Sequence, residues 1–454
     1  MSDQAIVAAL RAQVLPLRTD DDLDAVLDHI GDASLVLMGE ASHGTREFYR
    51  LRADLSKRLI VEKGFDAIAV EADWPDALQV SRFVQLAGSD QTADQALSGF
   101  ERFPQWMWRN EEVVDLVYWM RLHNQHVSDP ERRIGFYGLD LYSLRKSMHA
   151  VVHYLDHADP EAAARARSRY SCFDHMGADP QRYGYAASFG MKPDCEQEAV
   201  RQLMELTENA QLHLALPGGA VPDDLFYAQQ NARVAKNAET YYRAMFTGRD
   251  ESWNIRDTHM ADTLDALRAH LSRRKGGPAR IAVWAHNSHL GDASATEMGQ
   301  QGQHNLGQLM RERCASDEVY LLGFSTHYGT VTAASEWDGA AESKRVLPSR
   351  LDSVERLLHD VGEGLDGEPH LERFMLPIRG REPVRHALPS LLLERAIGVI
   401  YRPETERVSH YFNADVAWQF DGVIHVDRTS AVKPLEYSAH WSGGEVPETY
   451  PSGL

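Results

Sequence analysis

The sequence predicts an α/β protein with a mainly parallel central sheet that is flanked by helices. Three observations support this fold class. Short apolar runs typical of buried strands recur along the chain, helical patterns separate most of them, and one long central stretch has almost no strand signal. Strands that alternate with helices favour a parallel sheet, because each connecting helix packs back onto a face of the sheet.

Seven apolar runs are predicted as strands, and most of them end at a polar cluster. The predicted strands are 34–38, 67–70, 134–137, 281–284, 319–322, 397–400 and 423–426. The helical patterns between them cover 46–63, 111–126 and 144–156.

The central stretch predicts a helical insertion. Further helical patterns lie there at 161–170, 196–214, 224–246 and 255–273. We therefore expect a helical insertion over 142–278 within an α/β body made of 1–141 and 279–454. Turn-rich residues and short strands after 322 predict a small α+β subdomain within about 325–395 of that body.

Composition indicates a globular protein and limits its partners. The chain has 454 residues, of which 43% are hydrophobic and 25% are charged, and its formal net charge is −20. So negative a surface repels phosphate groups, which argues against nucleic acid and anionic membranes as partners. No run approaches the roughly 18 apolar residues of a membrane span. We expect a small molecule as the ligand, and the oligomeric state stays open.

The N-terminus and the cysteines favour a cytoplasmic protein. The first 15 residues have neither a basic segment nor a small-residue cleavage site, so we predict no signal peptide. The chain has three cysteines, Cys172, Cys195 and Cys314, an odd number, and they are widely spaced in the sequence. This pattern predicts reduced thiols in place of a disulfide framework.

Polar turns follow four of the predicted strands. His43 lies in the turn after the first strand, and Glu71 directly follows the second. Asp140 ends the third, and His286 begins the turn after the fourth. Ligands bind beyond the carboxyl ends of parallel strands, where such turns converge. We therefore expect the four turns to meet in one solvent-accessible pocket.

Two histidines, His43 and His286, with Glu71 as their expected carboxylate partner, suit the activation of water. Imidazole has a pKa near ~6.5 and can remove a proton from water at neutral pH, while a carboxylate on its other nitrogen stabilises the imidazolium. A second histidine, or Arg52 on the following helix, could donate to the oxyanion that forms on a carbonyl. Singly, each residue has a structural explanation: Glu71 could pair with an arginine, Asp140 could cap a helix, and Arg52 could form a surface salt bridge.

Several familiar motifs do not occur. The segment 39–44 reads GEASHG, which has one residue too many for a G-x-S-x-G nucleophile elbow, so Ser42 is predicted as a helix N-cap. Neither H-E-x-x-H nor C-x-x-C is present, and no metal or cofactor is predicted. A G-x-G-x-x-G at 362–367 follows a helical pattern and is predicted as a loop, because a dinucleotide site needs a preceding strand.

Five segments resemble the erythromycin esterase family. They are GEASHGT at 39–45, the turn at Glu71, GFYGLD at 135–140, SWNIRD at 252–257 and WAHNSH at 284–289. The resemblance implies an α/β body with a helical insert and a small α+β domain, and hydrolysis of the macrolactone ring of 14-membered macrolides without a bound metal. It also implies that His43 is the general base. The residues that would complete the site are Glu40, Arg52, Glu71, His286 and His289.

The substrate-binding surface is less well defined. Trp106, Trp108 and Trp253 could give an apolar surface for a large lactone, although such aromatics are more often packing residues. We include Asp140 with them as a candidate for substrate binding. Two other functions remain open: metal-assisted hydrolysis with His43, Glu71 and His286 as ligands, and a protein that holds haem or another ligand in the same cleft.

Overall fold

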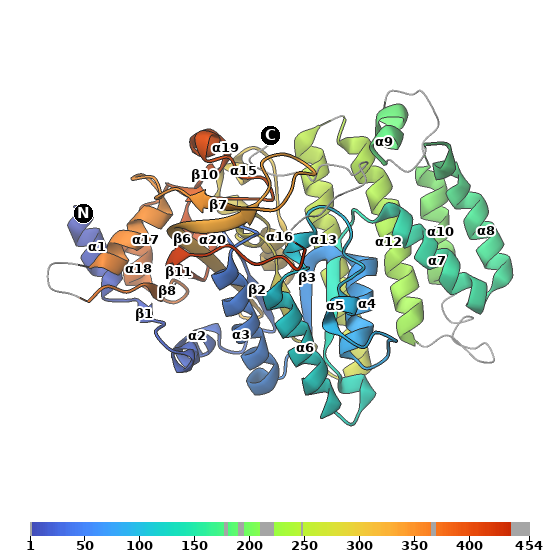
Figure 1. Ribbon diagram of the computed structural model, residues 1–454, viewed down its shortest axis with the longest axis horizontal. Helices are drawn as coiled ribbons and strands as arrows, with labels where there is room; N and C mark the ends of the chain where they lie inside the picture. Colours follow the sequence, from blue (N-terminus) through green and yellow to red (C-terminus); the bar gives the residue numbers. More distant parts are fainter. Residues whose placement is uncertain are drawn as a thin grey trace.

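The computed structural model describes residues 2–176, 180–188, 195–208, 222–246, 248–364 and 369–436. A nine-stranded sheet lies at its centre, with the order β1-β8-β11-β6-β2-β5-β3-β4 and with β7 paired to β6 (Figure 1). The strands are β1 Leu15–Pro16, β2 Leu35–Met38, β3 Ala67–Asp73, β4 Gly135–Asp140, β5 Ile281–Trp284, β6 Val319–Ala333, β7 Glu342–Val346, β8 Arg373–Pro377 and β11 Gly422–Thr429. A separate antiparallel pair is formed by β9 Leu392–Arg395 and β10 Tyr411–Ala414.

The sheet is mainly parallel, which confirms the predicted fold class. Six neighbouring strands, from β11 to β4, pair in parallel. β1, β7 and β8 pair antiparallel, at the periphery of this block. The parallel block places the carboxyl ends of β2, β3, β4 and β5 at one edge, because these strands run in the same direction.

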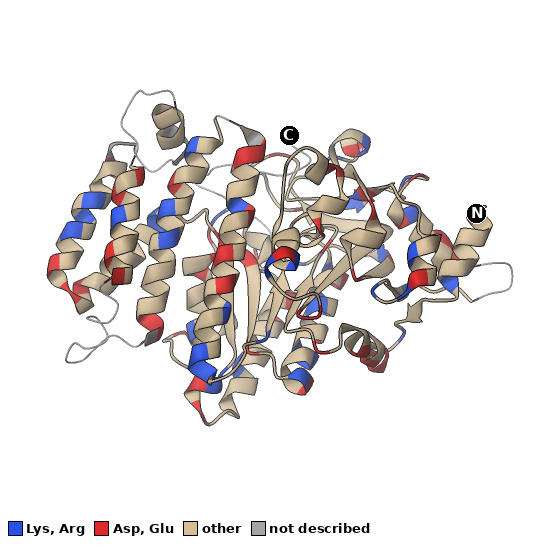
Figure 2. Cartoon of the chain, turned by 180° about the vertical axis from the view of Figure 1, so that it is seen from behind, with Lys and Arg blue, Asp and Glu red and all other residues tan. Residues whose placement is uncertain are grey.

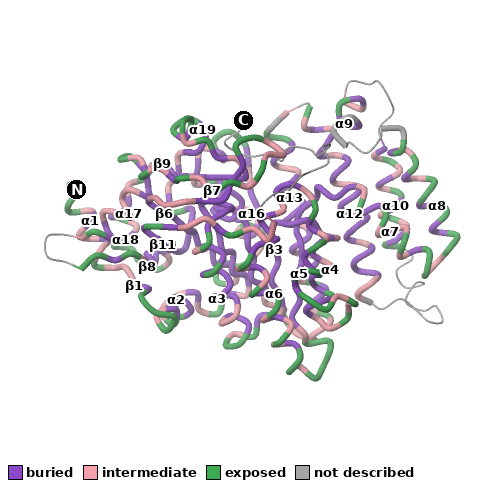
Figure 3. Tube along the Cα trace, viewed as in Figure 1, coloured by how far each residue is buried: buried purple, intermediate pink, exposed green. Residues whose placement is uncertain are grey.

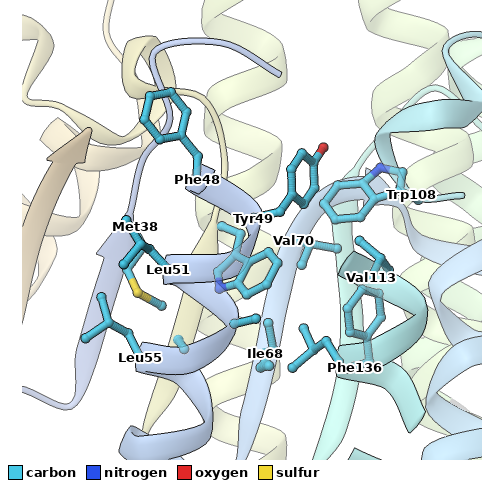
Figure 4. Packing of buried hydrophobic residues seen from close by; sticks show 14 of the residues in the cluster. Met38, Phe48, Tyr49, Leu51, Leu55, Ile68, Val70, Trp108, Val113 and Phe136 are labelled. Carbon is cyan, nitrogen blue, oxygen red and sulfur yellow. The ribbon is translucent and has the colours of Figure 1, made fainter. Parts of the chain in front are cut away.

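Both faces of the sheet are covered by helices. Along β2, Val36 and Met38 join one hydrophobic cluster, and Leu35 and Leu37 join the other. Figure 3 shows the resulting buried interior between exposed outer helices. In Figure 4, Met38 of β2 packs near Leu55 on the helix of the first face. The helices of this face are α2 Leu23–Ile30, α3 Arg46–Lys63 and α6 Glu111–Gln125; those of the other are α1 Asp3–Arg11, α13 Arg249–Lys275, α16 Leu306–Arg313 and α17 Val354–Glu363.

The strand prediction at 397–400 is wrong. Ile397 and Ile400 form only isolated bridges, to Ser42 and Ala334, and the strand of this region is β9, just before them. The apolar run is buried for a different reason: Ile397 packs with the distal half of β6 in a small separate cluster. Burial alone therefore produced the strand-like pattern. β1, β7, β8, β9 and β10 were not predicted.

The described residues between β4 and β5 form helices and no strand. Most of them lie at one end of the molecule in Figure 1 and share a hydrophobic cluster, whereas α13 packs against the sheet. The helices here are α7 Leu144–Ala158, α8 Pro160–Tyr170, η4 Ser171–Met176, α9 Pro180–Ser188, α10 Glu196–Glu208, α12 Pro222–Ala244 and α13. Part of the predicted helix 196–214 lies outside the described residues. We propose that 142–278 forms an insertion with these helices.

The end of α13 follows the sequence signals. Its last turn carries Arg273, Arg274 and Lys275, whose charges oppose the negative end of the helix dipole. Gly276 then adopts the left-handed conformation, with φ +72°, which a residue with a Cβ rarely adopts. This cap ends the helix just before β5, so the strand enters the sheet in register with β2 and β3.

The prediction of three reduced cysteines is wrong. Cys172 and Cys195 form a disulfide with their Cα atoms 5.9 Å apart, and only Cys314 is free. Their separation of 23 residues in the sequence hid this proximity, which arises because η4 and the start of α10 lie together in the helical cluster. The thiol argument for a cytoplasmic location therefore no longer holds.

The surface carries charges of both signs. Figure 2 shows acidic and basic residues interspersed along the outer helices. Across the described part of the chain, no helix combines the length and the apolar character that crossing a membrane requires.

Candidate active site

The turns after β2 and β5 bring two histidines together. The ring centroids of His43 and His286 are 4.9 Å apart. The two parent strands are neighbours in the sheet, which fixes this approach. Glu71 near the end of β3 and Asp140 at the end of β4 lie at the same edge, so the four predicted polar segments do gather in one place.

Close backbone approach explains the glycines of the first turn. A Cβ on Gly39 would lie 2.1 Å from Oδ1 of Asn287, and one on Gly44 would lie 1.8 Å from the carbonyl oxygen of Thr332. Either contact is impossible without movement of the backbone or of a buried side chain. Ser42 is not the N-cap that we predicted: α3 begins after Thr45, whose hydroxyl bonds to that of Ser42.

His43 belongs to a chain of three buried polar side chains. Its Nδ1 lies 3.0 Å from Oε1 of Glu40, and Arg52 donates to the other oxygen of that carboxylate. A carboxylate accepts only, so Nδ1 of His43 carries the proton and Nε2 is the basic nitrogen of the ring. The guanidinium of Arg52 also lies over the ring of Trp284. Arg52 is 1% exposed, so the alternative of a surface salt bridge is wrong.

His286 has the opposite tautomer. The backbone N–H of Ser288 donates to Nδ1 of His286 over 3.2 Å, so the neutral ring carries its proton on Nε2. Burial, together with the nearby His43 and His289, lowers the pKa of His286 well below its usual value. His286 is therefore a neutral imidazole, and a hydrogen bond to the backbone of Ala41 opposes part of the lowering of its pKa.

Arg256 of α13 holds the acidic turns together. Its Nη2 donates to Glu71 Oε1 at 2.7 Å and to Asp140 Oδ2 at 2.6 Å, and its Nε donates to Asp140 Oδ1 at 3.1 Å. The second oxygen of Glu71 accepts from the backbone N–H of His286 at 2.9 Å. Glu71 thus fixes the loop that carries His286, whereas the carboxylate partner of the His43 ring is Glu40.

His289 forms a second histidine–carboxylate pair beside Arg256. Its Nδ1 lies 2.9 Å from Asp257 Oδ2, and its Nε2 accepts from Arg256 Nη1 at 3.0 Å. Burial lowers the pKa of His289 to about 4, so the ring is neutral near pH 7. Trp253 stacks on the ring, with centroids 4.4 Å apart and planes 10° from parallel. His289 thus helps to position Arg256, while Oδ1 of Asp257 also accepts from the backbone N–H of Leu306 at 2.8 Å.

A model of the family Erythromycin esterase matches residues 60–429 of the chain. The chain belongs to the erythromycin esterase family. The matched residues begin after His43. The placement of the turn that carries His43 in the site therefore rests on the geometry of the structure. Membership supports a hydrolase of the esterase type.

The similar proteins in this family have low sequence identity to the chain. A putative hydrolase of Bacillus subtilis (strain 168) is 23% identical over 317 residues, which cover 66% of this chain and 67% of the relative. An erythromycin esterase type II from Escherichia coli is 23% identical over 331 residues, covering 69% and 74%. The solved structure of an erythromycin esterase mutant in its open conformation is 16% identical, with a TM-score of 0.64 over 92% of this chain and 96% of that one. This likeness shows the fold.

Arg256 and Asp257 are the residues of this esterase-family site that the sequence reasoning missed. Both lie on α13, more than 180 positions after Glu71, and no strand end marks them. The signal was the segment SWNIRD at 252–257, which supported the family resemblance without a role for its charged pair. An arginine and an aspartate in mid-helix were consistent with an ordinary solvated face.

The residues predicted to bind substrate have different places in the structure. Trp108 lines a hollow that reaches Glu71, whereas Trp106 is buried and is not among the residues that line this hollow. Trp253 is 1% exposed and packs on His289, and Asp140 is paired with Arg256. We keep Trp108 as a candidate for substrate binding; Trp253 and Asp140 support other site residues.

The site is closed in this structure. His43 is 2% exposed and His286 is 0% exposed, so the prediction of a solvent-accessible pocket around both rings is wrong here. His43 hydrogen-bonds to Glu40, and His286 hydrogen-bonds to Ser288. In the described part of the chain, no three His, Cys, Asp or Glu side chains are placed to hold one metal ion.

Buried histidines predict a loss of stability in acid. Burial lowers the pKa of His259 and of His289 to about 4. The pKa of a histidine in the unfolded chain is near ~6.5. Between pH 6.5 and 4 these two histidines therefore bind protons in the unfolded chain but not in the folded chain. The contribution of each neutral histidine to the free energy of unfolding is therefore fully present above about pH 6.5. It is lost as the pH falls to 4, by at most roughly 3 kcal/mol for each residue.

Glu394 predicts a loss on the alkaline side. Burial raises its pKa to about 8, so its contribution is complete below the unfolded value near ~4.5 and is lost as the pH rises to 8. Calorimetry from pH 4 to 9 should show the highest melting temperature between the two limbs. The variant Glu394→Gln should flatten the alkaline limb only; an unchanged alkaline limb would contradict the assignment.

Proposed function

We propose that this protein hydrolyses a carboxylic ester or lactone with water that His43 activates directly. The observation that carries the proposal is the pair of complementary tautomers. Nδ1 of His43 faces Glu40, so Nε2 is its basic nitrogen, whereas the ring of His286, 4.9 Å away between centroids, carries its proton on Nε2. One base and one neutral donor side by side are the two groups that addition of water to a carbonyl needs.

The proposed reaction has two steps. The water oxygen attacks the carbonyl carbon while Nε2 of His43 takes a proton, and Glu40 stabilises the imidazolium that forms. Nε2–H of His286 donates to the oxyanion. The tetrahedral intermediate then collapses, the bond from carbon to the alcohol oxygen breaks, and His43 returns its proton to that oxygen. A lactone yields one ring-opened hydroxy acid, and no covalent enzyme intermediate forms.

The finer proposal is a macrolide lactone as the substrate. The support is the family and the Escherichia coli relative that is named an erythromycin esterase. Metal-assisted hydrolysis by His43, Glu71 and His286 is the alternative, but both oxygens of Glu71 already accept hydrogen bonds from Arg256 and the His286 backbone. A chelator-treated sample separates the two, because only the alternative loses activity with the metal.

The experiment is a panel of macrolides and simple lactones, analysed by mass spectrometry for addition of one water. In water enriched in oxygen-18, a single turnover should place the label in the product carboxyl group and none in the protein. A protein that adds water to no ester or lactone in the panel would favour the remaining possibility, a protein that binds a ligand such as haem, and an absorption spectrum of the purified protein would test that directly.

A further inference from the structure

A small hollow lies beside Glu71, at the carboxyl end of β3. Its walls include Asp73, Asp76, Phe100, Arg102, Met107 and Trp108. The hollow thus joins the proposed catalytic cluster to the loop before α6. A group of a bound substrate that entered this hollow would lie next to Glu71.

Asp73 presents a vacant acceptor in this hollow. Its Oδ2 accepts from Nε of Arg102 at 3.1 Å, whereas its Oδ1 is buried and has no hydrogen-bond partner in the described structure. The residue as a whole is only 5% exposed. A buried carboxylate oxygen without a donor is destabilising, and a ligand or water that donates to it removes this cost.

Each carboxylate that lines the hollow already has a cationic partner. Glu71 pairs with Arg256, and Asp73 pairs with Arg102. Asp76 pairs with Lys146 at 3.1 Å, and burial beside Asp73 raises its pKa to about 7. An additional cation would lie close to Arg102 and Lys146, so the vacant oxygen suits a neutral donor better than an ammonium group.

The size and the walls indicate which neutral donor fits. The free space is about 30 Å³, whereas one water needs roughly 10–15 Å³. A hydroxyl or hydroxymethyl group therefore fits, and a whole sugar ring does not. The walls formed by Phe100, Met107 and Trp108 are apolar and suit the carbon atoms that carry such a group.

We propose that the hollow is a specificity subsite that binds one hydroxyl group of the substrate, with Asp73 Oδ1 as its acceptor. This inference rests on the proposed function, because it names a feature of the ester or lactone that the histidines would attack. The preferred substrate is then a hydroxylated ester or lactone whose hydroxyl group lies within reach of β3. A site built to receive such a donor discriminates against the analogue that lacks it.

The test compares a hydroxylated macrolactone with the same compound after O-methylation of its hydroxyl groups. We expect the unmodified protein to favour the hydroxylated compound by about tenfold or more in kcat/KM. The variant Asp73→Leu should reduce that ratio to near one. Asp94→Leu is the matched control, since Asp94 also pairs with an arginine but is 62% exposed; it should keep the ratio.

Binding to the inactive variant His43→Gln, measured by calorimetry, separates the two proposals. If neither compound is hydrolysed by the unmodified protein, the proposed function fails, and the ratio of the two dissociation constants still tests the subsite. A ratio near one in the unmodified protein, as expected if the hollow holds only water, overturns the inference. So does an unchanged ratio in Asp73→Leu.

Discussion

The variant His43→Gln should lower kcat by about a thousandfold, since general-base catalysis contributes roughly 10²–10⁴ and glutamine has no basic nitrogen. Glutamine nevertheless offers an N–H to Glu40 in place of Nδ1, so the chain from Arg52 through Glu40 can persist. We choose glutamine over alanine because His43 is buried and a cavity would confound the result. The measurement is single-turnover hydrolysis of whichever ester the panel identifies.

His410→Gln is the matched control for this prediction. His410 is as deeply buried as His43, with 2% exposure, and it hydrogen-bonds to the carbonyl oxygen of Ala396. A general effect of losing a buried imidazole would slow both variants alike, whereas our account predicts near-normal turnover in His410→Gln. Retention of most activity by a folded His43→Gln protein would show that another group is the base.

Arg256→Met should cost about 3–5 kcal/mol of unfolding free energy and remove activity as well. Arg256 is 2% exposed, and its replacement leaves the buried carboxylates of Glu71 and Asp140 without their cation. The loop with His286 would then lose its anchor, because Glu71 holds the backbone N–H of that residue. Denaturant unfolding gives the free energy, and turnover of the same sample gives the activity.

Two comparisons sharpen this prediction. Arg46→Met removes a partner of Glu112 from a side chain that is 44% exposed, and it should cost less than about 1 kcal/mol. Arg256→Lys keeps the charge but cannot hold Asp140 with two nitrogens, so its loss should lie between the other two. If Arg256→Met were as stable as Arg46→Met, the carboxylates would not depend on Arg256 and our description of the cluster would be incorrect.

The sequence predicted the parallel block well because both faces of it are buried. β5 was predicted with its observed bounds, and α3 likewise, because both have a clear apolar pattern and a clear terminator. The peripheral strands were missed for the opposite reason. β7 has mostly exposed residues and β1 has two residues, so neither leaves a hydrophobic signal.

The site was predictable only as far as topology determines it. Parallel neighbours bring His43 and His286 to one edge, and this follows from the strand order. The tautomers depend on single hydrogen bonds to Glu40 and Ser288, which no pattern reports. Arg256 reaches the cluster from the far end of the helical segment, and its role depends on the packing of α13.

The central claim is that two neighbouring histidines hold opposite neutral tautomers. Nitrogen-15 NMR of the protein labelled at histidine tests it most directly, with His43→Gln and His286→Asn used to assign the two rings. Our account predicts protonation at Nδ1 for His43 and at Nε2 for His286 near pH 8. A His286 ring that is charged there, or two rings protonated at the same nitrogen, would contradict it.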